Sequence, residues 1–356
     1  MLDEHGVKSG HAVDAFAGTA SVGRFLKRRG FRVTSCDIMT YSHVLQKAYV
    51  EVDSVPMFSG LDAVLDMNGA PVRAGGNGTA ATHRLAAVLH YLEAVVPGRA
   101  SLMSKEFAGR GASEDGKRMY FTVENALRID AVREVVDDWR RSHLIDDAEQ
   151  WVLLASLLEA LDAVANTTGV YAAYVKSWQS NALRPLRLRV PELTTDTGLD
   201  CRALRGNINE LAEGLGEIDL LYLDPPYNAR QYSGYYHIPE LVAMGWSSGA
   251  PQLRGKTGLI PDSDKRSDWS RRGSCVRALN NLLDHVNARY VAMSYNSEGI
   301  IPEEEIKRTL ESRGARGSFR IHERDYARYR SDRDRTERRY KAARVLERIY
   351  FVEMKR

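Results

Sequence analysis

Residues 218–236 read IDLLYLDPPYNARQYSGYY, an apolar run that stops abruptly at a turn. The run is interrupted only by Asp219 and ends at Asp224-Pro225-Pro226-Tyr227. A short apolar run closed by a turn signal is typical of a strand buried on both faces of a parallel sheet. Two consecutive prolines cannot continue the strand, because each lacks an amide donor and fixes its own φ. We therefore predict a stiff loop at the carboxyl end of this strand, where open α/β sheets bind ligands.

A second α/β signal lies near the amino end, in residues 11–37. A short apolar strand leads into a turn at Gly18, an amphipathic helix then runs to Gly30, and a second strand ends in Asp37. This is the order of the first half of a nucleotide-binding βαβ unit, where the acid accepts hydrogen bonds from ribose hydroxyls. No GxGxxG fingerprint is present, so a compact nucleoside such as S-adenosylmethionine fits better than a dinucleotide. An α/β unit without a ligand is the alternative.

The α/β pattern is interrupted for more than a hundred residues between these two signals. Residues 82–95, 129–139 and 146–164 have helical apolar spacing, which predicts a mostly helical inserted lobe. The predicted domains are residues 1–54 for the first part of the α/β domain, 55–192 for the lobe and 193–356 for the second part.

Two polar stretches of the lobe, residues 105–125 and 171–189, combine basic and aromatic side chains. Such a mixture suits contact with phosphates and unstacked bases. Irregular solvated loops explain the composition equally well.

The α/β pattern resumes near Asn207. Residues 207–215 predict a short helix before the strand that begins at Ile218, and residues 251–274 predict a mobile, glycine-rich loop. The remaining chain predicts a helix and two strands, at residues 277–286, 290–295 and 344–354, and the last strand would suit an antiparallel edge.

The length, composition, cysteines and apolar runs of the sequence exclude some classes of protein. The chain has 356 residues, enough for one large domain or two smaller ones, and its composition is that of an ordinary globular protein. Its cysteines show no metal-binding spacing and suit the reducing cytoplasm (Cys36, Cys201 and Cys275). No run approaches 18 apolar residues and no signal peptide is visible, so we expect a cytoplasmic protein without a membrane segment.

Positive charge is concentrated at the carboxyl end. Residues 306–356 hold 17 Lys and Arg against 8 Asp and Glu, a local +9, so the rest of the chain sums to −6 for the total of +3. Such a concentration is expected of a polyanion binder. A solvated, salt-bridged face fits it as well.

The turn after the strand carries groups that could act on an exocyclic amino group of a base. The lone pair of such a nitrogen is delocalised into the ring, which makes it a poor nucleophile. The Asp224 carboxylate and the Pro225 carbonyl could accept its two hydrogens and pull it towards a tetrahedral geometry. Pro226 stiffens the loop, and Tyr227 offers a face on which an extruded base can stack. On this hypothesis the amino group needs positioning rather than a strong base.

Several motifs in order resemble the Dam-like class of adenine-specific DNA methyltransferases, and more closely its branch of FokI-type modification enzymes. FAGTASVG at residues 16–23 is similar to the family's S-adenosylmethionine loop, and Asp37 lies where its ribose-binding acid does. DPPYN at 224–228, with the following RQY and YH, is similar to the catalytic segment, and SYNSEG at 294–299 resembles a later motif.

The resemblance implies a Rossmann-like, S-adenosylmethionine-dependent methyltransferase sheet that acts on a flipped adenine of double-stranded DNA. It also implies a restriction-modification system in which a cognate restriction endonuclease is a candidate partner. The implied cofactor-binding residues are Phe16, Ala17, Gly18, Thr19, Val22, Gly23, Asp37, Ile38 and Asn207. Recognition is expected in the lobe and beside the catalytic loop, with candidate DNA contacts at Arg110, Lys117, Arg118, Lys176, Arg184, Arg230 and Tyr232.

The chain departs from the family pattern at two places. The family has a glycine-containing segment with a lysine some tens of residues before the cofactor loop. Only thirteen residues precede Asp14 here, so we expect that segment to be absent or truncated. The family often has Asp where this chain has Asn207. Asn can still accept through its carbonyl oxygen, so we expect weaker rather than lost contact with the cofactor's adenine.

Other classes fit less well. Methylation of a cytosine ring carbon needs a nucleophilic cysteine, usually after proline, and none of the three cysteines follows one. Methylation of a cytosine amino group, or of adenine in RNA, uses similar acceptor groups and stays open. A protein glutamine methyltransferase would more often carry Asn in place of Asp224. The alternative from another class is a cofactor-impaired, non-catalytic DNA-binding module.

Overall fold

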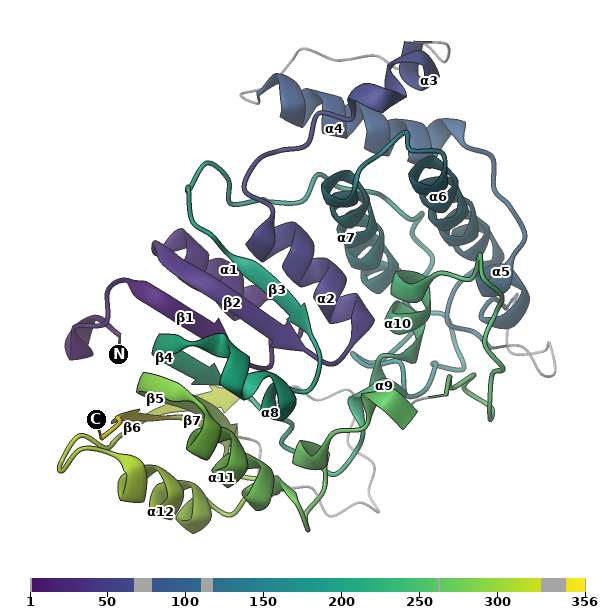
Figure 1. The fold of residues 1–356 in the computed structure, drawn as a ribbon. Coiled ribbons are helices and arrows are strands. Elements are labelled where there is room, and N and C mark those ends of the chain that lie inside the picture. The colour runs from purple at the N-terminus through teal and green to yellow at the C-terminus, as the bar shows by residue number, and fades with distance from the viewer. Residues whose placement is uncertain (1, 67–78, 110–117, 262, 328–343, 356) are drawn as a thin grey trace. The chain divides into compact units, whose positions relative to one another are not determined.

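The computed structural model describes residues 2–66, 79–109, 118–261, 263–327 and 344–355. The chain forms two compact units, whose elements are labelled in Figure 1. The first unit comprises Met1–Gln46, Thr197–Tyr232 and Asp264–Arg356. The second comprises Lys47–Asp196 and Ser233–Ser263, so it takes in the residues of the proposed lobe together with a later segment.

The first unit is built on a seven-stranded sheet in the order β3-β2-β1-β4-β5-β7-β6 (Figure 1). Neighbouring strands from β3 to β5 are parallel, and β7 is antiparallel to both β5 and β6. The strands are β1 (Gly10–Asp14), β2 (Phe31–Asp37), β3 (Arg202–Arg205), β4 (Glu217–Leu223), β5 (Asn287–Asn296), β6 (Arg320–Ala327) and β7 (Arg344–Glu353). This is the mixed α/β class that the sequence predicts.

The helices of the first unit follow the strands in the order expected of an α/β domain. They are η1 (Asp3–His5), α1 (Ser21–Arg28), α2 (Thr40–Gln46), α8 (Ile208–Leu211), η5 (Ala212–Leu215), η7 (Asp268–Ser270), α11 (Cys275–His285) and α12 (Glu303–Arg313). The 3-10 turn η6 (Ser263–Lys265) begins at the last residue of the second unit.

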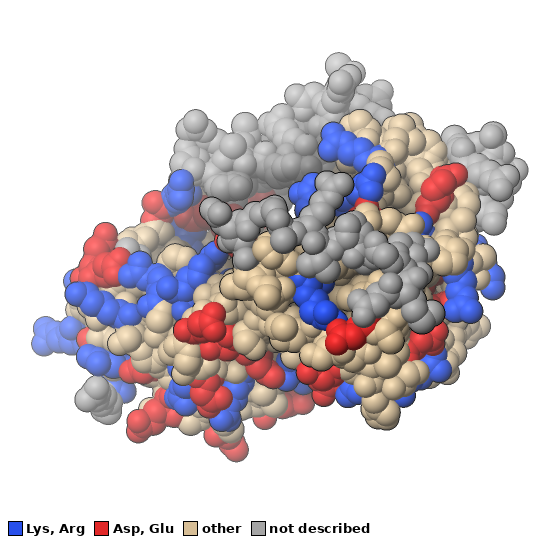
Figure 2. All heavy atoms as spheres, turned by 90° about the horizontal axis from the view of Figure 1, so that it is seen from above, with Lys and Arg blue, Asp and Glu red and all other residues tan. Residues whose placement is uncertain are grey.

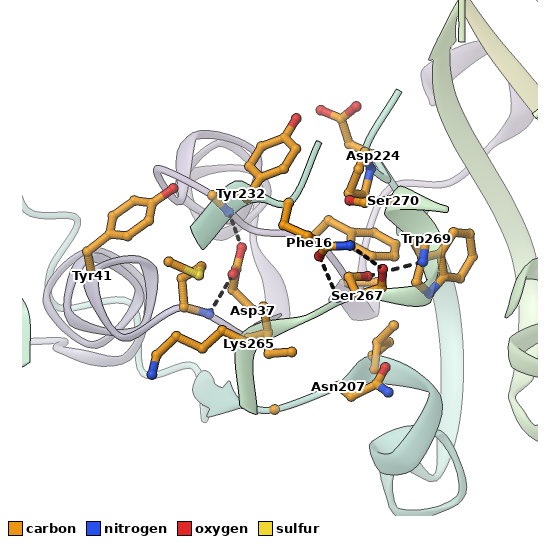
Figure 3. Close-up of a pocket in the computed structure, with 18 residues that line it drawn as sticks. Phe16, Asp37, Tyr41, Asn207, Asp224, Tyr232, Lys265, Ser267, Trp269 and Ser270 are labelled. Atoms are coloured by element: carbon orange, nitrogen blue, oxygen red, sulfur yellow. Dashed lines mark hydrogen bonds between the residues drawn. The ribbon is translucent and has the colours of Figure 1, made fainter. Parts of the chain in front are cut away.

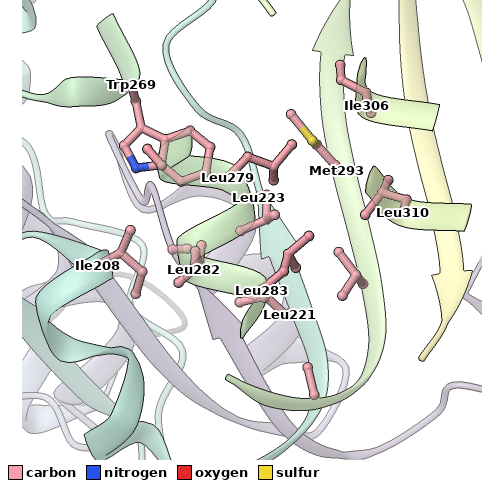
Figure 4. Packing of buried hydrophobic residues seen from close by; sticks show 14 of the residues in the cluster. Ile208, Leu221, Leu223, Trp269, Leu279, Leu282, Leu283, Met293, Ile306 and Leu310 are labelled. Carbon is pink, nitrogen blue, oxygen red and sulfur yellow. The ribbon is translucent and has the colours of Figure 1, made fainter. Parts of the chain in front are cut away.

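The central strand β4 has a partner strand on each edge and buried leucines on both faces. It pairs with β1 on one side and β5 on the other. Leu221 and Leu223 point to one face, where they pack with Met293 of β5 and with leucines and isoleucines of α11 and α12 (Figure 4). This core fixes the end of β4, and with it the start of the Asp-Pro-Pro-Tyr loop.

The carboxyl-terminal strands differ from the sequence prediction in one respect. β7 is antiparallel, as predicted, but it is not at the edge of the sheet, because β6 pairs along its other side. The sequence analysis missed β6. Its residues, RIHERDYA, include four charged side chains, three of them consecutive (Glu323, Arg324 and Asp325), which hides the period of a strand and suits an exposed edge.

The second unit is helical. Its elements are η2 (Lys47–Glu51), η3 (Ser59–Leu61), α3 (Asp62–Asp66), α4 (Ala80–His90), η4 (Tyr91–Val95), α5 (Leu102–Glu106), α6 (Val123–Arg141), α7 (Asp147–Ala163) and α10 (His237–Met244). The short helix α9 (Tyr232–Tyr235) begins at the last residue of the first unit's middle segment. The three helices predicted from apolar spacing are confirmed as α4 with η4, α6 and α7.

Helix α7 shows why this prediction succeeded. Asp146 caps its amino end by accepting from the Glu149 amide at 2.8 Å, and Glu149 accepts in return from the Asp146 amide at 2.9 Å. Its leucines and alanines are buried over most of its length, against α6 and α10. Within the described residues, no helix is both long enough and apolar enough to cross a membrane.

Candidate active site

The Asp37 carboxylate ties together the loops that follow β1 and β2. One oxygen accepts from the Gly18 amide and the other from the Met39 amide, each at 2.9 Å. Gly18 has φ of +51°, a left-handed conformation that costs a glycine little. Ala20, two residues further along the turn, also has positive φ, at 60°. It is the N-cap residue of α1, and its side chain makes no capping hydrogen bond. The loop is thus held in a strained shape by Asp37, as binding loops often are.

A pocket of about 690 Å³, partly continuous with solvent, lies at the carboxyl ends of these strands (Figure 3). Its mixed apolar and polar lining is typical of a small-molecule site. Eight residues that the sequence analysis selected line it: Phe16, Gly18, Asp37, Ile38, Asn207, Asp224, Pro226 and Tyr232. The other selected residues from the two loops of this unit, all described, lie outside its lining: Ala17, Thr19, Val22, Gly23, Pro225, Tyr227 and Arg230.

Residues that the sequence analysis did not select complete the pocket. Trp269 lies edge-on to Phe16, with 5.0 Å between ring centroids, and donates from its indole nitrogen to Asn209 at 2.7 Å. Gln231 and Ser267 form two reciprocal side-chain to backbone hydrogen bonds of 2.8 and 3.1 Å. Lys265, Ser267, Trp269 and Ser270 come from the stretch interpreted as a mobile loop. A buried tryptophan within that polar stretch is the signal that could have identified them.

The Asn207 side chain makes hydrogen bonds within its own helix turn. Its side-chain oxygen accepts from the Asn209 amide at 3.2 Å, and its side-chain nitrogen donates to Glu210 at 3.1 Å. It therefore caps α8 at the edge of the pocket. Its predicted contact with a bound adenine stays a prediction.

The Asp-Pro-Pro-Tyr loop is supported by residues at the end of β5 and just after it. The Tyr295 hydroxyl donates to the Pro226 carbonyl at 3.4 Å and accepts from the Ile301 amide at 3.1 Å. The Ile300 amide donates to the Tyr227 carbonyl at 3.1 Å. Gly299 is needed here, because a Cβ on it would lie 2.0 Å from the Tyr295 ring. These contacts hold the loop in place.

Two side chains of the supported loop, Asp224 and Tyr227, remain accessible to solvent. The Tyr227 side chain is 48% exposed, so its ring can stack on an incoming planar group. Asp224 opens to solvent on one side, while protein atoms surround the rest of it. A ligand can therefore reach the carboxylate from the pocket.

Burial and negative charge perturb the acids around Asp224. Burial and the charge of Glu347 raise the pKa of Asp224 to about 6. Burial and the charge of Asp224 raise the pKa of Asp14 to about 7. Glu347 lies on β7 directly opposite Asn296 of β5, and burial raises its pKa too. Such concentrations of perturbed acids are typical of functional sites.

Comparisons with known proteins identify the family of the chain. A family model described as D12 class N6 adenine-specific DNA methyltransferase matches residues 1–309. The chain belongs to this family. The resemblance read from the motifs is thus confirmed, and the seven-stranded sheet is consistent with a methyltransferase fold. No solved structure matches the chain.

Three curated relatives of the chain differ in how much of their own length it covers. It is 34% identical to the type II methyltransferase M.FokI of Planomicrobium okeanokoites, over 99% of this chain and 50% of the relative. It is 31% identical to the modification methylase StsI of Streptococcus sanguinis, over 93% and 47%. It is 32% identical to the type II methyltransferase M.NlaIII of Neisseria lactamica, over 96% and 90%. The chain thus spans about half the length of the first two and most of the third.

The candidate DNA contacts that fall in the second unit differ in their surroundings. Lys176 and Arg184 are exposed, and Arg110 and Lys117 lie outside the described residues. Arg118 instead binds its own unit: its guanidinium donates to the carbonyls of Glu106, Gly255 and Lys256 and pairs with the Glu106 carboxylate at 2.8 Å. It also lies over the Phe107 ring, 5.6 Å from its centroid. These bonds indicate a structural role, and its phosphate contact stays a prediction.

The segment that carries Lys176 and Arg184 is irregular but well anchored. Asn166 is fully buried and donates to the carbonyls of Met119 and Val175 at 3.0 and 2.9 Å. Asn125 donates to the carbonyls of Ala182 and Arg184 and accepts from the Leu186 amide. The segment therefore presents its exposed cations from a fixed backbone.

The positive charge of the carboxyl end is partly neutralised by ion pairs. Arg348 pairs with Glu303 and Glu323 at 2.6 Å each, and Arg313 pairs with Asp284 at 2.6 Å. On the face shown in Figure 2, Lys and Arg are interspersed with Asp and Glu. The salt-bridged interpretation thus accounts for these two arginines, while residues 328–343 lie outside the described part of the chain.

Proposed function

We propose that this chain transfers a methyl group from S-adenosyl-L-methionine to the exocyclic amino group of adenine in double-stranded DNA. One observation carries the proposal. Asp224 and Pro226 of the Asp-Pro-Pro-Tyr loop line the same pocket as Phe16, Gly18 and Asp37 of the glycine loop and its acid. A methyl donor and an amino acceptor would thus meet in one place.

The pocket residues fit S-adenosylmethionine. Phe16, Ile38 and Trp269 supply an apolar and aromatic wall for a purine, and Asp37 supplies a carboxylate to which ribose hydroxyls can donate. The Ser270 hydroxyl is buried without a hydrogen-bond partner in the protein, so a polar ligand atom would satisfy it. When bound, this cofactor supplies an electrophilic methyl group on its sulfonium sulfur.

The protein's own contribution is to position the acceptor nitrogen. The ionised Asp224 carboxylate and the Pro225 carbonyl accept the two amino hydrogens, which localises the nitrogen lone pair. The Pro226 carbonyl is less suited, because it already accepts from Tyr295. The exposed ring of Tyr227 stacks on the flipped base and replaces part of the stacking lost from the duplex. The proton leaves after transfer, so Asp224 does not need to be a strong base.

We expect the pH profile of kcat/KM to report the ionisation of Asp224. The charged form is required and its pKa is raised to about 6, so activity should fall below about pH 6. Asp224→Asn cannot ionise and should lack this acid limb. Glu347→Gln removes a negative charge that disfavours ionisation, so it should move the acid limb to lower pH. Initial rates from pH 5 to 8 measure this, and an unshifted limb in Glu347→Gln would contradict it.

We further propose that the second unit recognises the target sequence. Its anchored segment with exposed Lys176 and Arg184 supports this, since phosphate contacts fix the register of a protein on DNA. The names of the relatives as type II methyltransferases favour a restriction-modification system with a cognate endonuclease.

A parallel incubation tests the function. Labelled S-adenosylmethionine is supplied with double-stranded DNA, RNA or protein, and the nucleosides of labelled nucleic acid are separated. We expect label in N6-methyladenine of DNA with the wild-type chain and its loss with Asp224→Ala. Label in RNA but not DNA would overturn the proposal. DNA binding without any transfer would favour the non-catalytic module.

A further inference from the structure

Three metal-binding side chains converge at a place remote from the proposed cofactor pocket. They are Glu4 and His5 of η1 and His322 of the edge strand β6. One potential ligand atom of each lies within 4.8 Å of the other two. Among the residues that the structure describes, this is the place where at least three such ligands meet.

The two imidazoles are spaced as a shared metal ion requires. Their Nε2 atoms lie 3.3 Å apart. Two nitrogens that bind one tetrahedral zinc ion, each about 2.0–2.1 Å from it, are separated by about 3.3 Å. Glu4 is exposed, so a rotation of its side chain can bring its carboxylate to the third position. Water would complete the tetrahedron.

Packing holds the rings in this arrangement. The His5 ring stacks on Phe351 of β7, with 4.1 Å between centroids and 16° between planes. It meets His322 edge-on, at 84°. Phe351 is buried, so it is a firm support. The orientation of the imidazoles is thus set before any ligand arrives, which reduces the entropy cost of binding.

The surroundings of the His5 ring favour its neutral form. Burial and the neighbouring His322 lower the pKa of His5. Neutral imidazole is the form that binds metals. The positive charge of Arg320 disfavours a cation at this place, and the negative charge of the Glu4 carboxylate compensates for it.

We propose that Glu4, His5 and His322 form a binding site for a divalent transition metal, with zinc as the best-fitting ion. Two imidazoles and one carboxylate are a donor set typical of zinc. The bound ion would join η1, which precedes β1, to β6 at the far edge of the sheet. It would therefore link these two segments and stabilise the first unit, independently of methyl transfer.

Titration of untagged protein with zinc chloride tests the site. We expect one zinc ion per chain, and binding at least about tenfold weaker in His5→Gln and in His322→Gln, since each removes one of three ligands. His285→Gln is the matched control, because His285 is a partly exposed histidine of the same unit outside the cluster. It should bind zinc as the wild type does.

Two further readouts keep the test independent of folding defects and of activity. Cobalt(II) chloride should give the visible absorption of a tetrahedral ion with the wild type and the control, but not with either cluster variant. Zinc should raise the thermal unfolding midpoint of the first two proteins only, and EDTA should reverse the rise. Circular dichroism without metal checks that the variants fold. Equal zinc affinity in His322→Gln, or no saturable binding by the wild type, would overturn the proposal.

Discussion

Replacing Asp224 by Ala is expected to slow methyl transfer to adenine about a thousandfold, the loss typical when a preorganised hydrogen-bond partner is removed from an active site. This corresponds to about 4 kcal/mol of lost transition-state stabilisation. The reason is positional, because the loop is braced by Tyr295 and Ile300 and cannot supply another acceptor at the same place. Single-turnover rates with saturating cofactor and DNA measure the effect directly.

Two comparisons separate this effect from damage to the fold. Asp224→Ala should bind S-adenosylmethionine and DNA with nearly wild-type affinity, since the carboxylate acts on the reacting nitrogen. Asp224→Asn keeps one acceptor oxygen of the same size and should fall between the wild type and the alanine variant. A wild-type rate in Asp224→Ala would exclude the proposed role.

Asp37→Ala is expected to weaken S-adenosylmethionine binding about a hundredfold. It removes hydrogen bonds from the Gly18 and Met39 amides to a carboxylate, and each such bond contributes about 1.5–3 kcal/mol. It also removes the proposed acceptor for the ribose hydroxyls. Without Asp37 the strained turn at Gly18 and Ala20 loses the contact that holds it. Equilibrium dialysis or calorimetry with the cofactor measures the loss.

Asp219→Ala is the matched control for Asp37→Ala. Asp219 also accepts from a backbone amide, that of His11 at 2.7 Å, but it lies near the amino ends of β1 and β4 and does not line the pocket. Its replacement should lower stability with little effect on cofactor affinity. If both variants bound the cofactor equally weakly, a general loss of fold would explain the result better than a ribose contact.

Asp37→Ala and Asp224→Ala should separate two functions of the pocket, cofactor binding and catalysis. Asp37→Ala should raise the cofactor concentration needed for half-maximal rate, whereas Asp224→Ala should lower the maximal rate. The distinction follows from the chemistry, since one carboxylate would bind the donor equally in ground and transition states and the other would act mainly as the nitrogen becomes tetrahedral.

The sequence by itself determined the features that depend on neighbouring residues. The apolar run of β4 and the two prolines after it specified a strand and a stiff loop, and the residues from His11 to Asp37 specified a strand-turn-helix-strand unit. Helical spacing located α4, α6 and α7. Motif order identified the family, because several local patterns together are far more specific than one.

Only the tertiary structure decided which distant residues share an environment. Trp269 meets Phe16 across some 250 positions, and Glu347 raises the pKa of Asp224 through strand pairing at the sheet. Arg118 is a candidate phosphate contact by composition, and only the structure shows that its guanidinium also donates to backbone carbonyls. The role of a charge depends on burial and on neighbours brought together by packing, and neither has a local signature in the sequence.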